Sequence, residues 1–158
     1  MLLHELTHAW QAALPDDAFD ALLAALAARD RASGFDAPTV EQATTSVAFG
    51  VAAKFTDQRA AAQLGARLLA RARTVPADRP GALAARAAVL ARLFVDPEWR
   101  AVRATLARGR GDARGRGWDA WLHALLLLEV QAYDAQRHCV TGGTADWGDS
   151  APTLASGR

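Results

Sequence analysis

The chain is built from residues that favour helices and has almost no pattern that favours strands. Alanine, leucine and arginine dominate its 158 residues, β-branched residues are few, and apolar and polar side chains never alternate for long. Those three residues are among the strongest helix formers, whereas strands are enriched in β-branched and aromatic residues. The sequence therefore predicts an all-α fold.

Prolines and glycines divide the chain into about five to six predicted helices. The breaks lie near Pro15, Gly34, Pro76, Pro80 and Pro97, because such residues stop or start helices. The predicted helices cover residues 1–14, 17–32, 39–56, 80–95, 97–108 and 117–138; a continuation of the third to residue 72 stays open, because Asp57 interrupts its pattern. We expect one helical domain over residues 1–140, a connecting loop at 109–117 and a flexible tail at 141–158, with the first helix packed against the last.

The first predicted helix carries the motif His4-Glu5-Leu6-Thr7-His8. Residues four apart lie on one face of a helix, with Cβ atoms about 5–6 Å apart, so His4 and His8 can reach one metal ion. Zinc suits them, since its bonds to histidine nitrogen are about 2.0–2.1 Å long. Glu5 lies beside this face, where it can take a proton from a metal-bound water. The alternative, a coincidental pair of surface histidines, is less consistent with the apolar helical context.

Glu129 is the strongest candidate for a third ligand. It lies in the predicted helix 117–138, which is apolar nearly all round. A carboxylate is costly in such surroundings unless it is paired or bound to a metal. The alternative is a partly exposed glutamate that pairs with Arg137 or another arginine.

Other residues that could bind a metal fit less well. His123 lies among leucines and is expected to be a hydrogen-bonded core residue, and His138 repeats no ligand spacing. Asp16 and Asp17 follow the first helix and are expected to cap the second. Cys139 is the only cysteine, which excludes a disulfide within the chain and a cysteine-based zinc site.

The segment HELTHAWQ resembles the active-site helix of the zincin metallopeptidases, in particular of short bacterial HExxH proteins. Gln11 and Leu14 stand where the metzincin subclass has a glycine and a third histidine. Glu129-Val-Gln-Ala-Tyr-Asp is similar to the Glu-x-x-Ala segment of gluzincin-like families, which carries their third ligand. The resemblance implies a gluzincin-like Zn²⁺ site with His4, His8 and Glu129 as ligands and Glu5 as the general base.

Tyr133 and Asp134 mark a departure from the thermolysin-like pattern, which has an aspartate four residues after its ligand glutamate. Here that position is Tyr133, and Asp134 is one residue further on. Tyr133 is one turn from Glu129 on the same helix face. In a gluzincin its hydroxyl would polarise the substrate carbonyl; the alternative is a tyrosine packed at the edge of the core.

The resemblance implies hydrolysis of a peptide or protein substrate by zinc-activated water. Zincins ordinarily place a twisted sheet before the motif helix, and its edge strand binds the substrate. Only three residues precede His4. We therefore expect either a fragment, completed by a partner chain or a missing N-terminal segment, or a reduced helical form with weak or absent peptide cleavage. The alternative function is a non-catalytic helical module with a structural or vestigial metal site.

Charge and hydropathy restrict the partners further. The formal net charge is +1, Lys54 is the only lysine, and no series of aromatic residues accompanies the arginines, so no nucleic-acid partner is expected. No apolar run reaches the roughly 20 residues that span a membrane, and no secretory signal precedes the motif. A cytoplasmic bacterial protein is expected.

Overall fold

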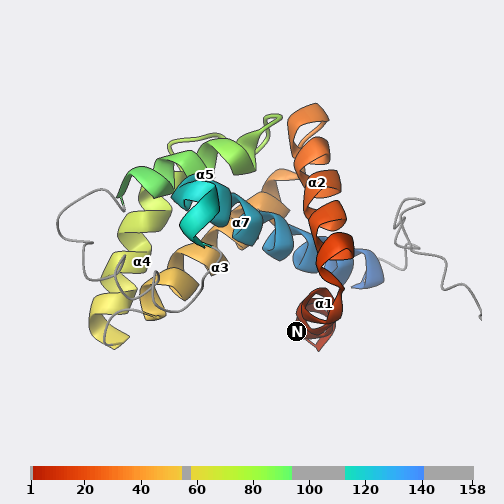
Figure 1. The fold of residues 1–158 in the computed structure, drawn as a ribbon. Helices are drawn as coiled ribbons and strands as arrows, with labels where there is room; N and C mark the ends of the chain where they lie inside the picture. Colours follow the sequence, from red (N-terminus) through yellow and green to blue (C-terminus); the bar gives the residue numbers. More distant parts are fainter. Residues whose placement is uncertain (1, 55–57, 94–112, 141–158) are drawn as a thin grey trace, which may run out of the picture.

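A computed structural model describes residues 2–54, 58–93 and 113–140. This part of the chain forms six helices and no strand (Figure 1), which confirms the all-α prediction. The helices are α1 (Leu2–Ala13), α2 (Asp16–Ala32), α3 (Ala37–Ala53), α4 (Gln58–Ala72), α5 (Ala82–Leu93) and α7 (Ala113–Val140). The motif helix α1 packs against the C-terminal helix α7, as predicted. The predicted helix 97–108 and the predicted tail 141–158 lie outside the described residues.

Four helix starts differ from the predictions; α2 begins one residue earlier, at Asp16, and α5 two residues later, at Ala82. Helix α3 begins at Ala37 rather than at residue 39, because the Asp36 carboxylate caps it by accepting a hydrogen bond from the Thr39 backbone N–H (3.1 Å). Helix α7 begins at Ala113, within the predicted loop 109–117. The break falls at Gly117, whose backbone has φ of 73° and ψ of 159° inside this helix. Glycine adopts that conformation without the strain that a side chain would add.

Helix α7 is the centre of the arrangement. It packs against α1, α2, α3 and α5, while α4 packs against α3 and α5. Figure 1 shows α4 and α5 toward the start of α7 and α1 and α2 toward its end. Residues from the two ends of the chain therefore lie side by side at the end of α7.

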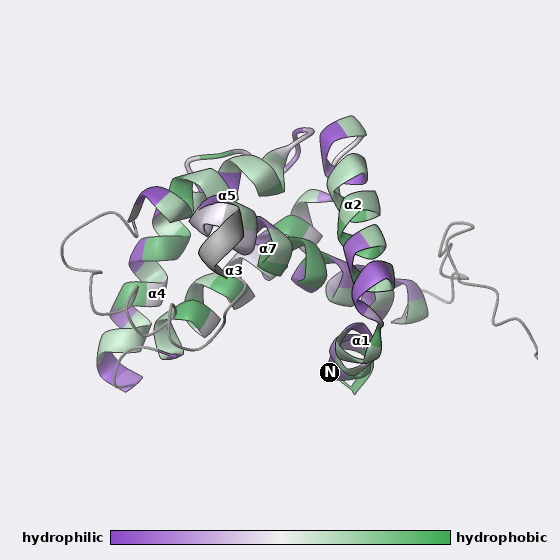
Figure 2. Cartoon of the chain, viewed as in Figure 1, coloured by the Kyte–Doolittle hydropathy of each residue, from purple (hydrophilic) through white to green (hydrophobic). Residues whose placement is uncertain are grey.

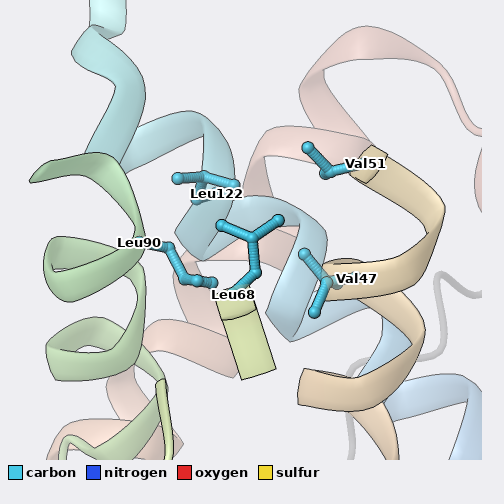
Figure 3. A pocket seen from close by; sticks show the side chains of 6 residues that line it. Val47, Val51, Leu68, Leu90 and Leu122 are labelled. Atoms are coloured by element: carbon cyan, nitrogen blue, oxygen red, sulfur yellow. The ribbon is translucent and has the colours of Figure 1, made fainter. Parts of the chain in front are cut away.

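The apolar core lies between α3, α4, α5 and α7. Side chains from all four helices converge there (Figure 3), among them Val47, Leu68, Leu90 and Leu122, and each of these is at most 5% exposed. They leave no room for a water molecule between them. This region stabilises the fold by close packing, and it is no candidate ligand site.

Asp30 joins α2 to α5 and α7, although its side chain is fully buried. Its carboxylate accepts hydrogen bonds from the backbone N–H groups of Leu83 (3.2 Å) and Ala84 (3.1 Å) at the start of α5, and it lies 3.5 Å from Nε2 of His123 on α7. Burial alone would raise the pKa of this carboxyl. The His123 ring and the two N–H groups outweigh burial and hold the pKa of Asp30 below its ordinary value.

Two more carboxylates anchor α3. Glu41 pairs with Arg73 (2.8 Å) and with the buried Arg86 of α5, and Asp36 pairs with Arg137 of α7. Burial would raise the pKa of both carboxyls, but hydrogen bonds from Arg73 and Arg86 lower the pKa of Glu41. Hydrogen bonds within the α3 cap and the charge of Arg137 likewise lower the pKa of Asp36.

Helix α1 buries a polar face and exposes large apolar side chains. Its buried side chains are the polar Thr7 and Gln11, while Leu2, Leu6 and Trp10 are 76%, 54% and 43% exposed. Hydrophobic and hydrophilic residues therefore both occur along the α1 ribbon in Figure 2, but the buried face is polar. Apolar burial contributes little to holding this helix on α7. None of the described helices has the length and apolar character that a membrane span requires.

Candidate metal centre

The three predicted ligands, His4, His8 and Glu129, converge between α1 and α7. The two Nε2 atoms are 3.2 Å apart. Glu129 Oε2 is 3.4 Å from Nε2 of His4, and Glu129 Oε1 is 3.3 Å from Nε2 of His8. These three side chains form a group that could hold a metal ion.

The separations fit a zinc ion. Ligand atoms about 2.0–2.1 Å from a tetrahedral zinc ion lie about 3.3–3.4 Å from one another. The nitrogen–nitrogen distance of 3.2 Å and the nitrogen–oxygen distances of 3.3 and 3.4 Å lie close to that value. Two imidazoles and one carboxylate are also a common protein ligand set for catalytic zinc. The residues present therefore fit the metal that the motif implies.

The hydrogen bonds of His8 place a proton on Nδ1 and turn Nε2 toward Glu129. The carbonyl of Leu128 can only accept, so Gln11 directs its amide nitrogen toward it (3.1 Å) and its oxygen toward Nδ1 of His8 (2.8 Å). Nδ1 of His8 must then carry the proton and donate to that oxygen. In the neutral ring the lone pair of Nε2 faces Glu129 at 3.3 Å. Two electron-rich atoms at that distance repel each other, and either a proton on Nε2 or a metal ion between them relieves the repulsion; a zinc ion would do so for His4, His8 and Glu129 together.

The burial of the site supports the same interpretation. The side chains of His4, Glu129 and His8 are 12%, 19% and 30% exposed. Glu129 Oε2 and His4 Nδ1 are buried and have no hydrogen-bond partner in the described part of the chain. Buried polar atoms rarely lack partners, and a metal ion would satisfy the carboxylate oxygen.

Of the two predicted catalytic residues, Tyr133 contacts a ligand ring, while Glu5 adjoins His4 along α1. Glu5 is exposed on α1, one position after His4. Tyr133 is half-buried on α7, and its ring centroid is 4.4 Å from that of His4. Tyr133 therefore contacts a ligand ring directly, on the face of α7 that also carries Glu129.

The alternative ligands are elsewhere. Nε2 of His123 lies 3.5 Å from the Asp30 carboxylate, but it has no hydrogen-bond partner in the described part of the chain, so the predicted hydrogen-bonded core histidine is found only as a charge partner of Asp30. His138 Nδ1 lies 2.8 Å from the backbone carbonyl of Asp134. Asp16 and Asp17 occupy the first turn of α2; the prediction that they cap this helix was wrong, because Pro15 holds the N-cap position and no side chain caps it.

The residues that support His8 were not predicted from the sequence. Gln11 is 3% exposed, and its amide also donates to Oε1 of Gln131 (2.7 Å). Gln11 follows His8 by three positions, a spacing that places both on one helix face, and this is the one available signal. Asp134, the acidic residue near the expected position of the orienting aspartate, instead pairs with Arg29 (3.2 Å).

Comparisons with protein families, with curated proteins and with solved structures found no match to this chain.

Proposed function

We propose that the chain is a zinc-dependent hydrolase that cleaves amide bonds in a peptide or protein substrate, as a helical relative of the gluzincin-like zincins. The observation that carries the proposal is the convergence of His4, His8 and Glu129, with the lone pair of His8 Nε2 directed at the carboxylate. We propose His4, His8 and Glu129 as the ligands. Bound there, zinc would activate water and polarise the substrate carbonyl.

Glu5 is proposed as the general base. It lies about 60° from His8 around the α1 axis, since successive residues in a helix are about 100° apart. Its carboxylate is exposed, so it can take a proton from the attacking water and return it to the leaving amine without first breaking a buried contact.

Tyr133 is proposed to stabilise the developing negative charge on the carbonyl oxygen. The contact between its ring and that of His4 holds the tyrosine beside the ligands. A phenol hydroxyl can donate a hydrogen bond to that oxygen, and such donors act most strongly in sites that exclude water.

Two variants test the proposal. Glu5→Gln removes the base and keeps the shape, so hydrolysis of a mixed peptide library should be lost while zinc content stays at the wild-type level. Glu129→Ala should lower zinc occupancy sharply. Unchanged hydrolysis in Glu5→Gln would exclude Glu5 from the mechanism, and full occupancy in Glu129→Ala would mean that the third ligand is another residue.

A second function, a non-catalytic module with a structural metal, is favoured by one observation. Helix α1 packs mainly on α7 through polar side chains and exposes Leu2 and Leu6. A metal bound across α1 and α7 would then serve chiefly to attach α1. A partner chain or a preceding segment that covers this apolar face is part of this alternative. Zinc-dependent stability without peptide hydrolysis, together with unaltered stability in Glu5→Gln, would favour it.

A further inference from the structure

We infer that Gln11, itself held in place by Gln131, is a positioning residue that keeps His8 in the tautomer and orientation needed to bind the metal; the inference rests on the metal centre proposed above. The evidence is a buried set of hydrogen bonds that begins at His8, passes through Gln11 and ends on α7. Gln11 is 3% exposed and Gln131 is 9% exposed, so water competes little for these bonds.

The direction of each hydrogen bond follows from chemistry. The Leu128 carbonyl accepts from Nε2 of Gln11 at 3.1 Å, and Gln131 Oε1 accepts from the same nitrogen at 2.7 Å. Both protons of the Gln11 amide are thereby used. Its oxygen is left to accept from Nδ1 of His8 at 2.8 Å. A histidine that donates from Nδ1 presents the lone pair of Nε2, the atom that faces His4 and Glu129.

An amide is the group that this position needs. Gln11 accepts from the ligand ring and donates to α7 at the same time. A carboxylate could do only the first, because it has no proton to donate when ionised. Metal-bound histidines usually donate to a carboxylate, a backbone carbonyl or water. Here the side-chain amide adds a connection between the two helices that carry the ligands.

That connection also fixes the spacing of the ligands. Leu128 immediately precedes Glu129, so the hydrogen bond from Gln11 to its carbonyl sets how α1 lies along α7 next to the third ligand. Loss of Gln11 should therefore disturb both the orientation of His8 and its separation from Glu129. Residues that orient metal ligands typically change metal affinity by about 10–100-fold when they are replaced.

The test compares Gln11→Leu, Gln131→Leu and the control Thr7→Val with the wild type. Thr7 is also a buried polar residue of α1, but its hydroxyl donates to the Leu3 carbonyl of the same helix at 2.9 Å. Zinc affinity is measured by competition with a chromophoric chelator. The tautomer of His8 is read by long-range proton–nitrogen NMR of the metal-free protein, at a pH at which the ring is neutral.

We expect Gln11→Leu to bind zinc about 10–100-fold more weakly and to lose the preference for a proton on Nδ1. Gln131→Leu should keep that tautomer and weaken zinc binding less, because the His8 and Leu128 contacts of Gln11 persist. Thr7→Val should match the wild type in both measurements. If Gln11→Leu does not fold, the comparison of Gln131→Leu with the wild type keeps the inference testable.

Three results would count against this role. The inference is overturned if Gln11→Leu keeps wild-type affinity and tautomer, or if Thr7→Val weakens binding as much as Gln11→Leu. A wild-type protein that takes up no zinc would refute the proposed function instead. The tautomer of the metal-free protein would then decide the inference alone: its change in Gln11→Leu would support a positioning role, and its persistence would overturn it.

Discussion

Metal removal should release helix α1 while the remainder of the helical core stays folded. Across this interface Gln11 donates two hydrogen bonds to α7, one to the Leu128 carbonyl and one to Oε1 of Gln131. Hydrogen bonds contribute about 0.5–1.5 kcal/mol each, so this pair supplies about 1–3 kcal/mol. The apolar residues Leu2 and Leu6 are mostly exposed and add little. Undocking of α1 in the metal-free protein should therefore be frequent.

Zinc should suppress that undocking measurably. At a free zinc concentration of about 100 times Kd, binding adds about 2.7 kcal/mol to any state that requires the intact site. Exchange of α1 backbone amides with solvent deuterium should then slow about 100-fold, as measured by mass spectrometry of peptides from the exchanged protein. Helix α4 serves as an internal reference, because it packs on α3 and α5.

The His8→Ala variant is the matched control, because it should lose the zinc-dependent protection of α1 and keep the exchange of α4. Equal exchange of α1 in wild-type protein with zinc and with a chelator would refute the reasoning. So would a slowing of the same size in His8→Ala.

Three further predictions concern the carboxylates of Asp30, Asp36 and Glu41 and the hydroxyl of Tyr133. Asp30→Ala leaves two backbone N–H groups at the start of α5 without their acceptor, so the free energy of unfolding in urea should fall by about 2–5 kcal/mol; a loss below about 0.5 kcal/mol would contradict this role. The pKa values of Asp30 and Asp36 lie below their ordinary 3.8, and the pKa of Glu41 lies below its ordinary 4.5. These carboxylates therefore stabilise the fold above about pH 4–5, and this contribution to stability should fall as the pH drops through that range toward the lowered pKa values. Urea unfolding between pH 3 and 6 tests this, and a stability that rises on acidification would disagree. Tyr133→Phe should lower peptide hydrolysis about 100-fold with zinc content unchanged, whereas equal rates would remove the hydroxyl from the mechanism.

Local chemistry made much of the fold predictable from the sequence. Prolines and glycines lie near most helix ends, and the abundance of strong helix formers excluded a sheet. The boundaries that were wrong depend on single side-chain or backbone events. Asp36 caps α3 two residues before the predicted start, and Gly117 bends α7 after a helical turn has already formed.

The candidate ligands were predictable for two different reasons. His4 and His8 belong to one helix, so their spacing alone places them on one face. Glu129 was identified because a carboxylate in an apolar helix needs a partner. Its approach to α1 depends on how two helices from opposite ends of the chain pack, which the sequence indicated only through the family resemblance.

The supporting contacts could not be predicted in the same way. Gln11 and Gln131 are 120 positions apart, and neither belongs to a motif that specifies their contact. Helix periodicity also did not predict that the apolar face of α1 is exposed. Periodicity shows that a helix has two different faces, but it does not show which of them is buried. The polar face is buried here because it carries the ligands and Gln11.

Elemental analysis of the purified protein tests the central claim most directly. The account predicts about one zinc ion per chain in the wild type and in Thr7→Val, and a marked loss in Glu129→Ala and in His4→Ala. An absence of zinc from the wild type, even after refolding with added metal, would contradict the proposed metal centre.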